Sequence, residues 1–235
     1  PSAFLHSILE PLSLPQTKHY VTAIKGIEVN SKKVIAEYLE DTWNVPSENI
    51  ILVTGPCHAE EVAQEKLSYL TVSSLVEEKG QDFADLLSCR FINTKVNNDL
   101  YGAEYSAVLK NIYAIGAGIL HGLSYGDNFL AVYVSAATRE IEVFLEALHK
   151  TRRDVKDAAY LGDLLVTCYS QYSRNRTFGN MLGRGYSVKS AQLEMNMIAE
   201  GYYALEGMEA VRAKQDVAMP ILQAVYAIVY QGQSA

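Results

Sequence analysis

The stretch GAEYSAVLKNIYAIGAGILHGL, residues 102–123, decides the fold of the second half of this chain, because it is apolar on almost every side. Its large apolar residues recur at three- and four-residue steps, which is the helical period: Val108, Ile112, Ile115, Ile119 and Leu123. Alanines and glycines occupy much of the remaining surface, so other backbones can approach closely. A helix apolar nearly all round is buried, and each interior glycine costs roughly 1 kcal/mol against alanine. The stretch therefore predicts a buried helix with close-packed neighbours.

Upstream of this helix the pattern changes, since short β-branched runs alternate with helical segments. Strands are expected at 20–24, 50–54, 70–73 and 91–94, and helices at about 3–13, 31–43 and 80–87. Such alternation indicates a mainly parallel α/β sheet, in which ligands bind beyond the carboxyl ends of strands. Lys25 and Gly55 follow two of these ends, although both positions also suit ordinary turns.

Downstream, strand patterns stop after about residue 96 and helical patterns continue to the end. Helices are expected at 127–148, 155–166 and 186–197, after Glu200 through about 213, and from Pro220 as a first-turn proline to Tyr230. The fold class is therefore α/β followed by all-α. We expect two domains, residues 1–95 and 96–235.

Composition excludes several classes of protein. Hydrophobic residues make up 49% and charged residues 20% of the chain, which is typical of a soluble globular protein, and no apolar stretch is long enough to span a bilayer. The net charge of −7 argues against a broad nucleic-acid surface, so a local cation cluster must bind any anionic ligand. Cys57, Cys89 and Cys168 lack metal-ligand spacing, which favours reduced thiols in a cytoplasmic protein and no metal site.

Two groups of polar residues are candidates for a site. Lys110 stands inside the apolar helix, where it either snorkels to the surface or lies partly desolvated and able to transfer protons near neutral pH. The run LGDLLVTCYSQYSRNRTFG, residues 161–179, opens with Asp163 and closes with the cluster at 173–176.

That cluster, Ser173-Arg174-Asn175-Arg176, suits an anion that also carries hydroxyl groups. Arginine offers a planar fork to phosphate oxygens, and the amides of a helix start add partial positive charge. The alternative is a capped surface helix with Ser173 or Asn175 as N-cap and both arginines solvated.

Five blocks together resemble one known family. They are TAIKGIE (22–28), GPCHAEEVA (55–63), AVLKNIYAIGAG (107–118), GDLLVTCYSQYSRNRTFG (162–179) and AEGY (199–202). Their order and spacing resemble the soluble, bacterial type of NAD(P)-dependent glycerol-3-phosphate dehydrogenase, over essentially the whole chain. The resemblance implies an N-terminal Rossmann domain, a C-terminal helical domain and a substrate bound between them. It also implies cytoplasmic reduction of dihydroxyacetone phosphate by NADH or NADPH to sn-glycerol 3-phosphate, which feeds phospholipid synthesis.

The resemblance also implies roles for individual residues. Lys110 matches the catalytic proton donor and acceptor, Lys25 the second lysine near substrate and nicotinamide, and Asp163 their acidic partner. The implied substrate contacts are Lys25, Gly55, Cys57, Lys110, Asp163, Ser173, Arg174 and Asn175. The implied cofactor contacts are Lys25, Ala59, Arg174, Ile198 and Glu200.

Two features depart from the family pattern. Cys57 stands where the family usually has serine or threonine, and a thiol is a poorer hydrogen-bonding group. The family's GxGxxG loop, with its strand and helix, belongs before residue 1, so we expect a truncated enzyme that lacks most of the dinucleotide site.

Two alternatives stay open: another two-domain dehydrogenase acting on a hydroxyacid or sugar acid, or a helical binding or assembly module without catalysis. The apolar final helices also make a homodimer plausible.

Overall fold

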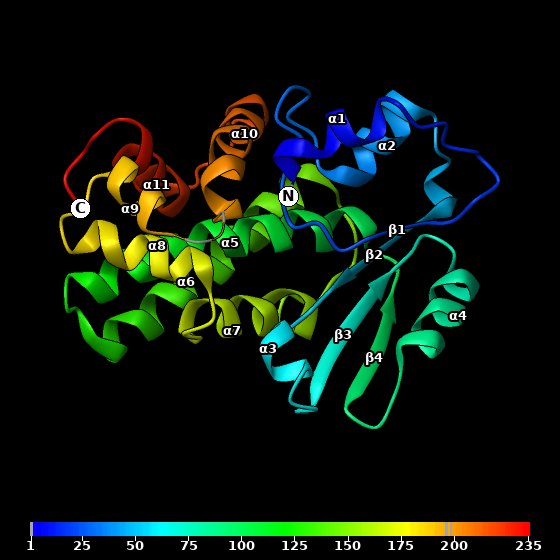
Figure 1. The fold of residues 1–235 in the computed structure, drawn as a ribbon, viewed down its shortest axis with the longest axis horizontal. Coiled ribbons are helices and arrows are strands. Elements are labelled where there is room, and N and C mark those ends of the chain that lie inside the picture. The colour runs from blue at the N-terminus through cyan, green and yellow to red at the C-terminus, as the bar shows by residue number, and fades with distance from the viewer. Residues whose placement is uncertain (1, 196, 198) are drawn as a thin grey trace.

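The structure is a computed structural model that describes residues 2–195, 197 and 199–235 (Figure 1). In the described residues, four strands form one sheet in the order β1-β2-β3-β4: β1 (Tyr20–Thr22), β2 (Ile50–Thr54), β3 (Ser68–Ser73) and β4 (Ile92–Asn97). β1 pairs with β2 and β3 with β4 in parallel, as expected for a mainly parallel sheet. β2 and β3 are antiparallel, because their connection holds the four-residue helix α3 (Ala59–Val62), shorter than a crossover helix.

The first half also contains short helical elements that pack beside the sheet. They are the 3₁₀ turns η1 (Ser2–Phe4) and η2 (Ser47–Asn49) and the helices α1 (Leu5–Leu9), α2 (Ile35–Trp43) and α4 (Glu77–Leu87). The helix expected at 3–13 is shorter than predicted, since Pro11 cannot continue the backbone hydrogen bonding. Its expected apolar face is about half exposed, with exposed fractions of 50%, 57% and 50% for Phe4, Ile8 and Leu12. Leu5 is the buried residue of this helix.

The second half is helical throughout the described residues. Its elements are α5 (Leu100–Gly122), α6 (Gly126–Leu148), the π-helix η3 (Ala158–Gly162), α7 (Asp163–Tyr169), α8 (Arg174–Gly183), α9 (Val188–Glu194), α10 (Glu200–Gln215) and α11 (Pro220–Tyr230). The helix expected at 155–166 therefore starts later, in a π-turn, and ends later. Within 2–195, 197 and 199–235, every helix falls short of the length and apolarity needed to cross a membrane.

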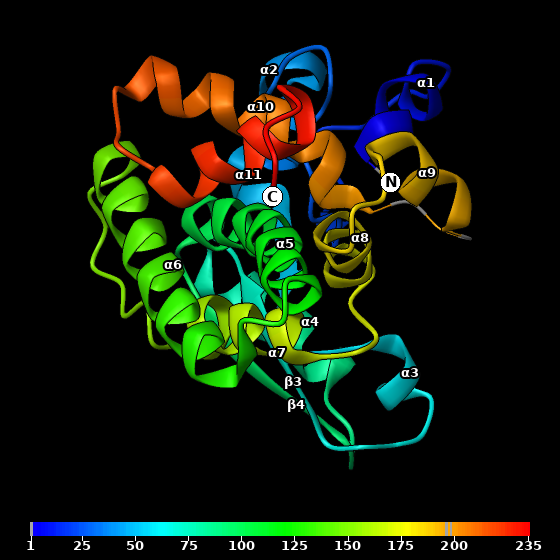
Figure 2. The same cartoon turned by 90° about the vertical axis from the view of Figure 1, so that its left-hand side faces the viewer.

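Helix α5 lies at the centre of this half, as the sequence predicts (Figure 2). Every residue from 102 to 119 is buried, and α6, α7, α8, α10 and α11 all pack against α5. The first turn of α5 belongs to a different apolar cluster, in which Leu100 and Ala103 join Tyr38 and Leu52 from the sheet half. Thus α5 ties the sheet half to the helical half.

Glycines allow α5 and α8 to pack with their backbones in contact. A Cβ on Gly179 would lie 1.9 Å from the carbonyl oxygen of Ile115, and a Cβ on Gly118 would lie 2.1 Å from that of Arg176. The expectation of close backbone approach is confirmed. This contact brings the beginning of α8 beside the middle of α5.

Replacing Gly179 with alanine should therefore overpack this contact. We expect Gly179→Ala to lower the free energy of unfolding by about 1–3 kcal/mol, because backbone rather than a flexible side chain must move. Urea unfolding followed by circular dichroism measures this loss of unfolding free energy. Gly162→Ala is the matched control, since the nearest atom to its added Cβ lies 3.6 Å away. An equal loss in both variants would contradict this explanation.

A buried carboxyl group caps helix α2 from a distant part of the chain. The two carboxyl oxygens of Glu104, on α5, accept hydrogen bonds from the backbone amides of Ile35 and Ala36, each at 3.1 Å. Complete burial raises the pKa of Glu104 to about 8, against the opposing effect of these two amides.

This raised pKa predicts how stability depends on pH. Because the folded chain holds the proton more tightly than the unfolded chain, the contribution of Glu104 is full below its unfolded pKa of 4.5 and is lost as the pH rises through about 8. The urea concentration at the midpoint of unfolding should decrease as the pH is raised from 5 to 9. Glu104→Gln should remove part of this dependence on pH. An identical slope in the variant would exclude Glu104 as its source.

Candidate active site

A cavity of about 540 Å³ lies where the carboxyl ends of β1 and β2 meet helices α5, α7 and α8. Nine of the site residues predicted from the sequence line it: Lys25, Cys57, Ala59, Lys110, Asp163, Ser173, Arg174, Asn175 and Glu200. Gly55 contacts the site through its backbone amide, and Ile198 lies outside the described residues. Residues up to 175 positions apart in the sequence are therefore brought to one cavity.

Lys110 and Asp163 form a buried ion pair in this cavity, with the lysine Nζ bonded to Asp163 Oδ1. Their side chains are only 8% and 1% exposed, so Lys110 is buried beside Asp163 and does not snorkel to the surface. Asp163 Oδ2 accepts a hydrogen bond from the amide of Gly55 at 3.2 Å. Since an unpaired buried charge is strongly destabilising, each partner holds the other in place.

Lys25 supplies a second ammonium group to the same space. It is half-buried in the loop after β1, where its Nζ donates to the carbonyl of Ala23 at 3.2 Å. Burial lowers the pKa of Lys25, and the charge of Lys110 lowers it further, against opposing effects from Asp163, Cys57 and Glu200. Because its pKa is lowered, Lys25 releases a proton more readily than an exposed lysine does.

Helix α8 begins at the cavity and presents the predicted cluster at 173–176. Ser173 is the N-cap, since its Oγ accepts from the amide of Arg176 at 3.3 Å. Asn175 has another role, because its Oδ1 accepts from the amide of Gly201 at 2.9 Å and so ties α8 to α10. Among the described lining residues the cluster contributes Arg174 but not Arg176, so the expected pair of guanidiniums is reduced to one.

The helix direction explains this difference between the two arginines. Successive helical residues project about 100° apart, so positions 174 and 176 leave α8 on different sides. The backbone of Arg176 packs against Gly118 of α5, on the side that faces the core. Arg174 therefore provides the guanidinium of the cavity, at a helix start whose amides also favour anions.

Cys57 lies at the cavity wall and is half-buried. Burial raises the pKa of its thiol, although the charge of Lys25 acts in the opposite direction. At neutral pH this residue is a neutral thiol and a weak hydrogen-bond donor.

Several residues that line the cavity were not predicted from the sequence, among them Asn111, Thr167, His58 and Tyr172. Asn111 Nδ2 donates to the carbonyl of Lys25 at 3.0 Å and so fixes that loop. Thr167 stands one helical turn after Asp163, and its Oγ1 donates to the carbonyl of Asp163 at 2.6 Å. The spacing from Asp163 was a usable signal for Thr167, because residues four apart share a helix face.

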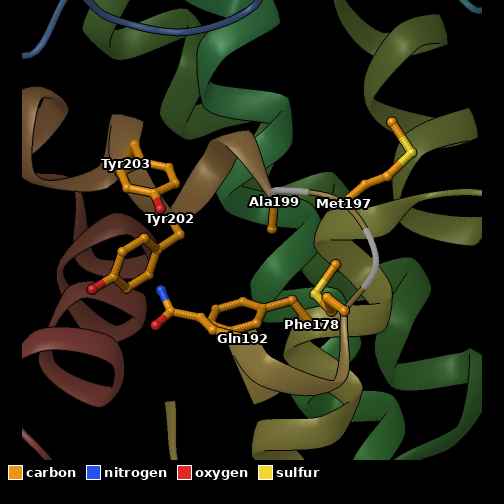
Figure 3. A pocket seen from close by; sticks show the side chains of 7 residues that line it. Phe178, Gln192, Met197, Ala199, Tyr202 and Tyr203 are labelled. Carbon is orange, nitrogen blue, oxygen red and sulfur yellow. The ribbon is translucent and has the colours of Figure 1, made fainter. Parts of the chain in front are cut away.

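A smaller pocket of about 250 Å³ adjoins α8, α9 and α10 (Figure 3). Aromatic and thioether side chains dominate its wall, with Phe178 and Tyr202 in an edge-to-face contact at 5.9 Å between ring centroids. Its lining includes Gln192 but no Lys, Arg, Asp or Glu among the described residues. This pocket therefore does not provide the charges that the larger cavity offers to an anion.

The fold defines a class: Rossmann-like α/β proteins that carry a C-terminal all-helical part. Family models for the C-terminus and the N-terminus of NAD-dependent glycerol-3-phosphate dehydrogenase match residues 99–235 and 1–80, respectively. The chain belongs to this family.

Individual relatives agree with the family models. Glycerol-3-phosphate dehydrogenase [NAD(P)+] of Clostridium tetani is 34% identical over 215 residues, which cover 92% of this chain and 61% of that protein. The Syntrophomonas wolfei protein of the same name is 34% identical, and the match covers 100% of this chain and 69% of the relative. The solved structure of glycerol-3-phosphate dehydrogenase from Coxiella burnetii superposes with a TM-score of 0.91 at 27% identity, covering 100% of this chain and 72% of that chain. This chain thus spans about three fifths of the first relative's length.

Proposed function

We propose that this chain provides the substrate side and the nicotinamide side of an enzyme that interconverts dihydroxyacetone phosphate and sn-glycerol 3-phosphate with NADH or NADPH. The observation that carries the proposal is the buried Lys110–Asp163 pair, which shares one cavity with Lys25 and Arg174. Two ammonium groups suit a carbonyl oxygen that gains negative charge, and a guanidinium suits a phosphate. Membership of the family supports this substrate class.

We propose a domain boundary near residue 95, which separates a sheet domain, residues 1–95, from a helical substrate domain, residues 96–235. The end of β4 at Asn97 and the start of α5 at Leu100 support a boundary in this region. The cavity includes residues from both parts, such as Lys25 and Lys110. The substrate would therefore be bound between them.

In the reduction, Lys110 acts as an ammonium group toward the carbonyl oxygen. A bound nicotinamide supplies the hydride that the carbonyl carbon receives. Lys110 stabilises the negative charge that then develops on the oxygen and donates the proton that completes the alcohol. Asp163 orients Lys110 through their ion pair and balances its charge.

Lys25 and the residues around it assist this transfer. Its ammonium group lies in the same cavity as Lys110 and adds to the polarisation of the carbonyl oxygen. Asn111 holds the backbone of Lys25 through the hydrogen bond at 3.0 Å. The two lysines therefore act as a coupled pair of positive groups.

The other end of the substrate is held at the start of α8. Arg174 binds the phosphate as a charged fork, and the hydroxyl of Ser173 and the amide of Asn175 complete the contact. Gly55 and Cys57 form the opposite wall, with the thiol as the weakest contact. Fixing the phosphate in one place sets the orientation of the carbonyl group toward Lys110.

The chain's residues fit a nicotinamide in part of the cavity. Lys25, Ala59, Arg174 and Glu200 line it, and together they offer the donors and the acceptor that a carboxamide requires. The carboxylate of Glu200 lies beside the loop of Lys25, since a Cβ on Gly26 would be 2.9 Å from Glu200 Oε2. Ile198 is the further proposed cofactor contact. The 235 residues contain no GxGxxG motif, so no residue is assigned to the pyrophosphate.

Isothermal titration with sn-glycerol 3-phosphate tests the substrate class. We expect the phosphate ester to bind, and glycerol and lactate to bind at least tenfold more weakly, because they lack the group that Arg174 recognises. Reduction of dihydroxyacetone phosphate with NADH and with NADPH tests the activity. Preference for a hydroxyacid or sugar acid would favour the other dehydrogenase, and a folded chain that binds none of these ligands would favour a non-catalytic module.

We also propose that the protein forms a homodimer and that it is located in the cytoplasm. The apolar helix α11 supports the homodimer, and light scattering after size-exclusion chromatography measures the mass in solution. The free thiols of Cys57, Cys89 and Cys168 support a reducing compartment. Fractionation of cells that express this protein tests that location.

A further inference from the structure

Three buried polar side chains form a cluster outside the cavity, at the junction of the sheet half and the helical half. Arg153 Nε and Nη2 donate to the two carboxylate oxygens of Asp99 at 2.7 and 3.2 Å, and the hydroxyl of Tyr160 donates to Asp99 Oδ2 at 2.7 Å. Asp99 is 7% exposed and Tyr160 3% exposed, and the side chain of Arg153 is 5% exposed. Burial would raise the pKa of Asp99, but the bonds from Arg153 and Tyr160 outweigh it and lower that pKa.

Asp99 is rigidly attached to α5, the helix that carries Lys110. Its Oδ1 accepts from the amide of Gly102 at 3.3 Å, which makes it the N-cap of α5, and its own amide donates to Asn97 Oδ1 at 3.2 Å. A Cβ on residue 102 would lie 2.2 Å from Asp99 Oδ2, so glycine leaves the space for this carboxylate. The carboxylate thus has a fixed place at the start of α5.

Tyr160 stands in the π-helix η3, which runs directly into Asp163 at the first residue of α7. A π-turn contains about one residue more than an α-turn, so its loss would rotate the following side chains by about 100°. Asp163 would then point away from Lys110 and from the amide of Gly55. The direction of the Asp163 side chain therefore depends on where the π-turn lies.

Stability alone does not account for such a cluster. A buried ion pair is often no more stabilising than apolar side chains of the same volume, although breaking one is costly. Arg153 also has a buried Nη1 with no hydrogen-bond partner among the described residues, which adds to the cost of this arrangement. What the cluster does provide is a directional link between the start of α5 and the π-turn.

We propose that Asp99, Arg153 and Tyr160 form a positioning unit, in which Asp99 anchors the π-turn through Tyr160 and so aims Asp163 at Lys110 and at the amide of Gly55. None of the three lines the cavity, so they act through Asp163 and not on the substrate. The effect on catalysis rests on the proposed function, whereas the effect on Asp163 does not.

Amide hydrogen exchange at Gly55 tests the unit without substrate or cofactor, because the Gly55 amide donates to Asp163 Oδ2. Tyr160→Phe keeps the ring and removes only the hydroxyl bonded to Asp99. We expect the Gly55 amide to exchange at least tenfold faster in this variant, while amides in the middle of α5 keep their rates.

The matched control is Tyr105→Phe. Tyr105 is also buried and its hydroxyl also donates to a carboxylate, Glu37 Oε2 at 2.9 Å, but it faces α2 and not η3. Gly55 exchange should be unchanged in this control. Unchanged exchange in Tyr160→Phe, or equally faster exchange in both variants, would overturn the proposal.

A second variant, Arg153→Lys, keeps the charge but lacks the planar fork that holds both oxygens of Asp99. We expect the Gly55 amide of this variant to exchange faster than in the wild type but more slowly than in Tyr160→Phe. Exchange at the wild-type rate would count against the positioning unit. Where the chain turns over dihydroxyacetone phosphate, Tyr160→Phe should lower kcat about tenfold with KM within twofold, since the residues at 173–175 are untouched. A rise in KM alone would overturn the role assigned to Asp163, even if the enzyme activity itself is as proposed.

Discussion

Replacing Lys110 with methionine is expected to reduce turnover of dihydroxyacetone phosphate at least a thousandfold. The substitution removes both the charge that stabilises the developing alkoxide and the proton that completes the alcohol. NAD(P)H oxidation, followed by absorbance for the enzyme with and without the substitution, measures the loss. Lys156→Met is the control, because the side chain of Lys156 is 77% exposed and is not among the cavity-lining residues.

The same variant should also be less stable, because Asp163 is left buried without its partner. Removing one partner of a buried ion pair costs roughly 3–5 kcal/mol. Adding Asp163→Asn to Lys110→Met should recover much of that stability, since an amide is neutral, but none of the activity. Recovery of both together would mean that Lys110 acts through folding and not in proton transfer.

Replacing Arg174 with methionine is expected to weaken binding of the phosphorylated substrate about 10–100-fold, since a hydrogen bond to a charged group contributes about 1.5–3 kcal/mol. The phosphate-free dihydroxyacetone should be affected little, because it lacks the group that Arg174 binds. Titration with sn-glycerol 3-phosphate measures the affinity, and the ratio of KM values for the two ketones measures the selectivity.

Arg176→Met is the matched control for this prediction. It removes an arginine from the same helix, two residues further on, but from a position outside the described cavity lining. We expect unchanged affinity for the phosphate ester and, because Nε of Arg176 is buried, some loss of stability. Equal losses of affinity in both variants would mean that the charge of α8 as a whole, and not a specific contact of Arg174, attracts the phosphate.

Several features of the fold follow from local patterns alone. Buried strands such as 50–54 appear where β-branched residues run together, and α11 starts at Pro220 as expected for a first-turn proline. The burial of α5 follows from an apolar surface on nearly all sides. These features were predictable because strand and helix periods depend on residues that are neighbours in the sequence.

Other features depend on contacts between distant residues. The sequence predicts a helix at 155–166, but the bond from Tyr160 to Asp99, 61 positions away, coincides with a π-turn there. The helix expected at 3–13 also differs from the prediction, since its expected apolar face stays about half exposed and Leu5, outside that face, is the buried residue of α1. Local periodicity cannot indicate which surface, if any, a face will contact.

The features of the site also separate into those that follow from local sequence and those that depend on distant contacts. The kinds of groups involved, the family and the candidate residues in five separate blocks could be predicted from the sequence. Three further points required the folded chain: Lys110 is desolvated against Asp163, Ser173 rather than Asn175 caps α8, and Arg174 rather than Arg176 lines the cavity. The physical reason is that solvent exposure and side-chain direction are set by elements packed from across the chain, such as Gly55 beside Asp163, 108 positions apart.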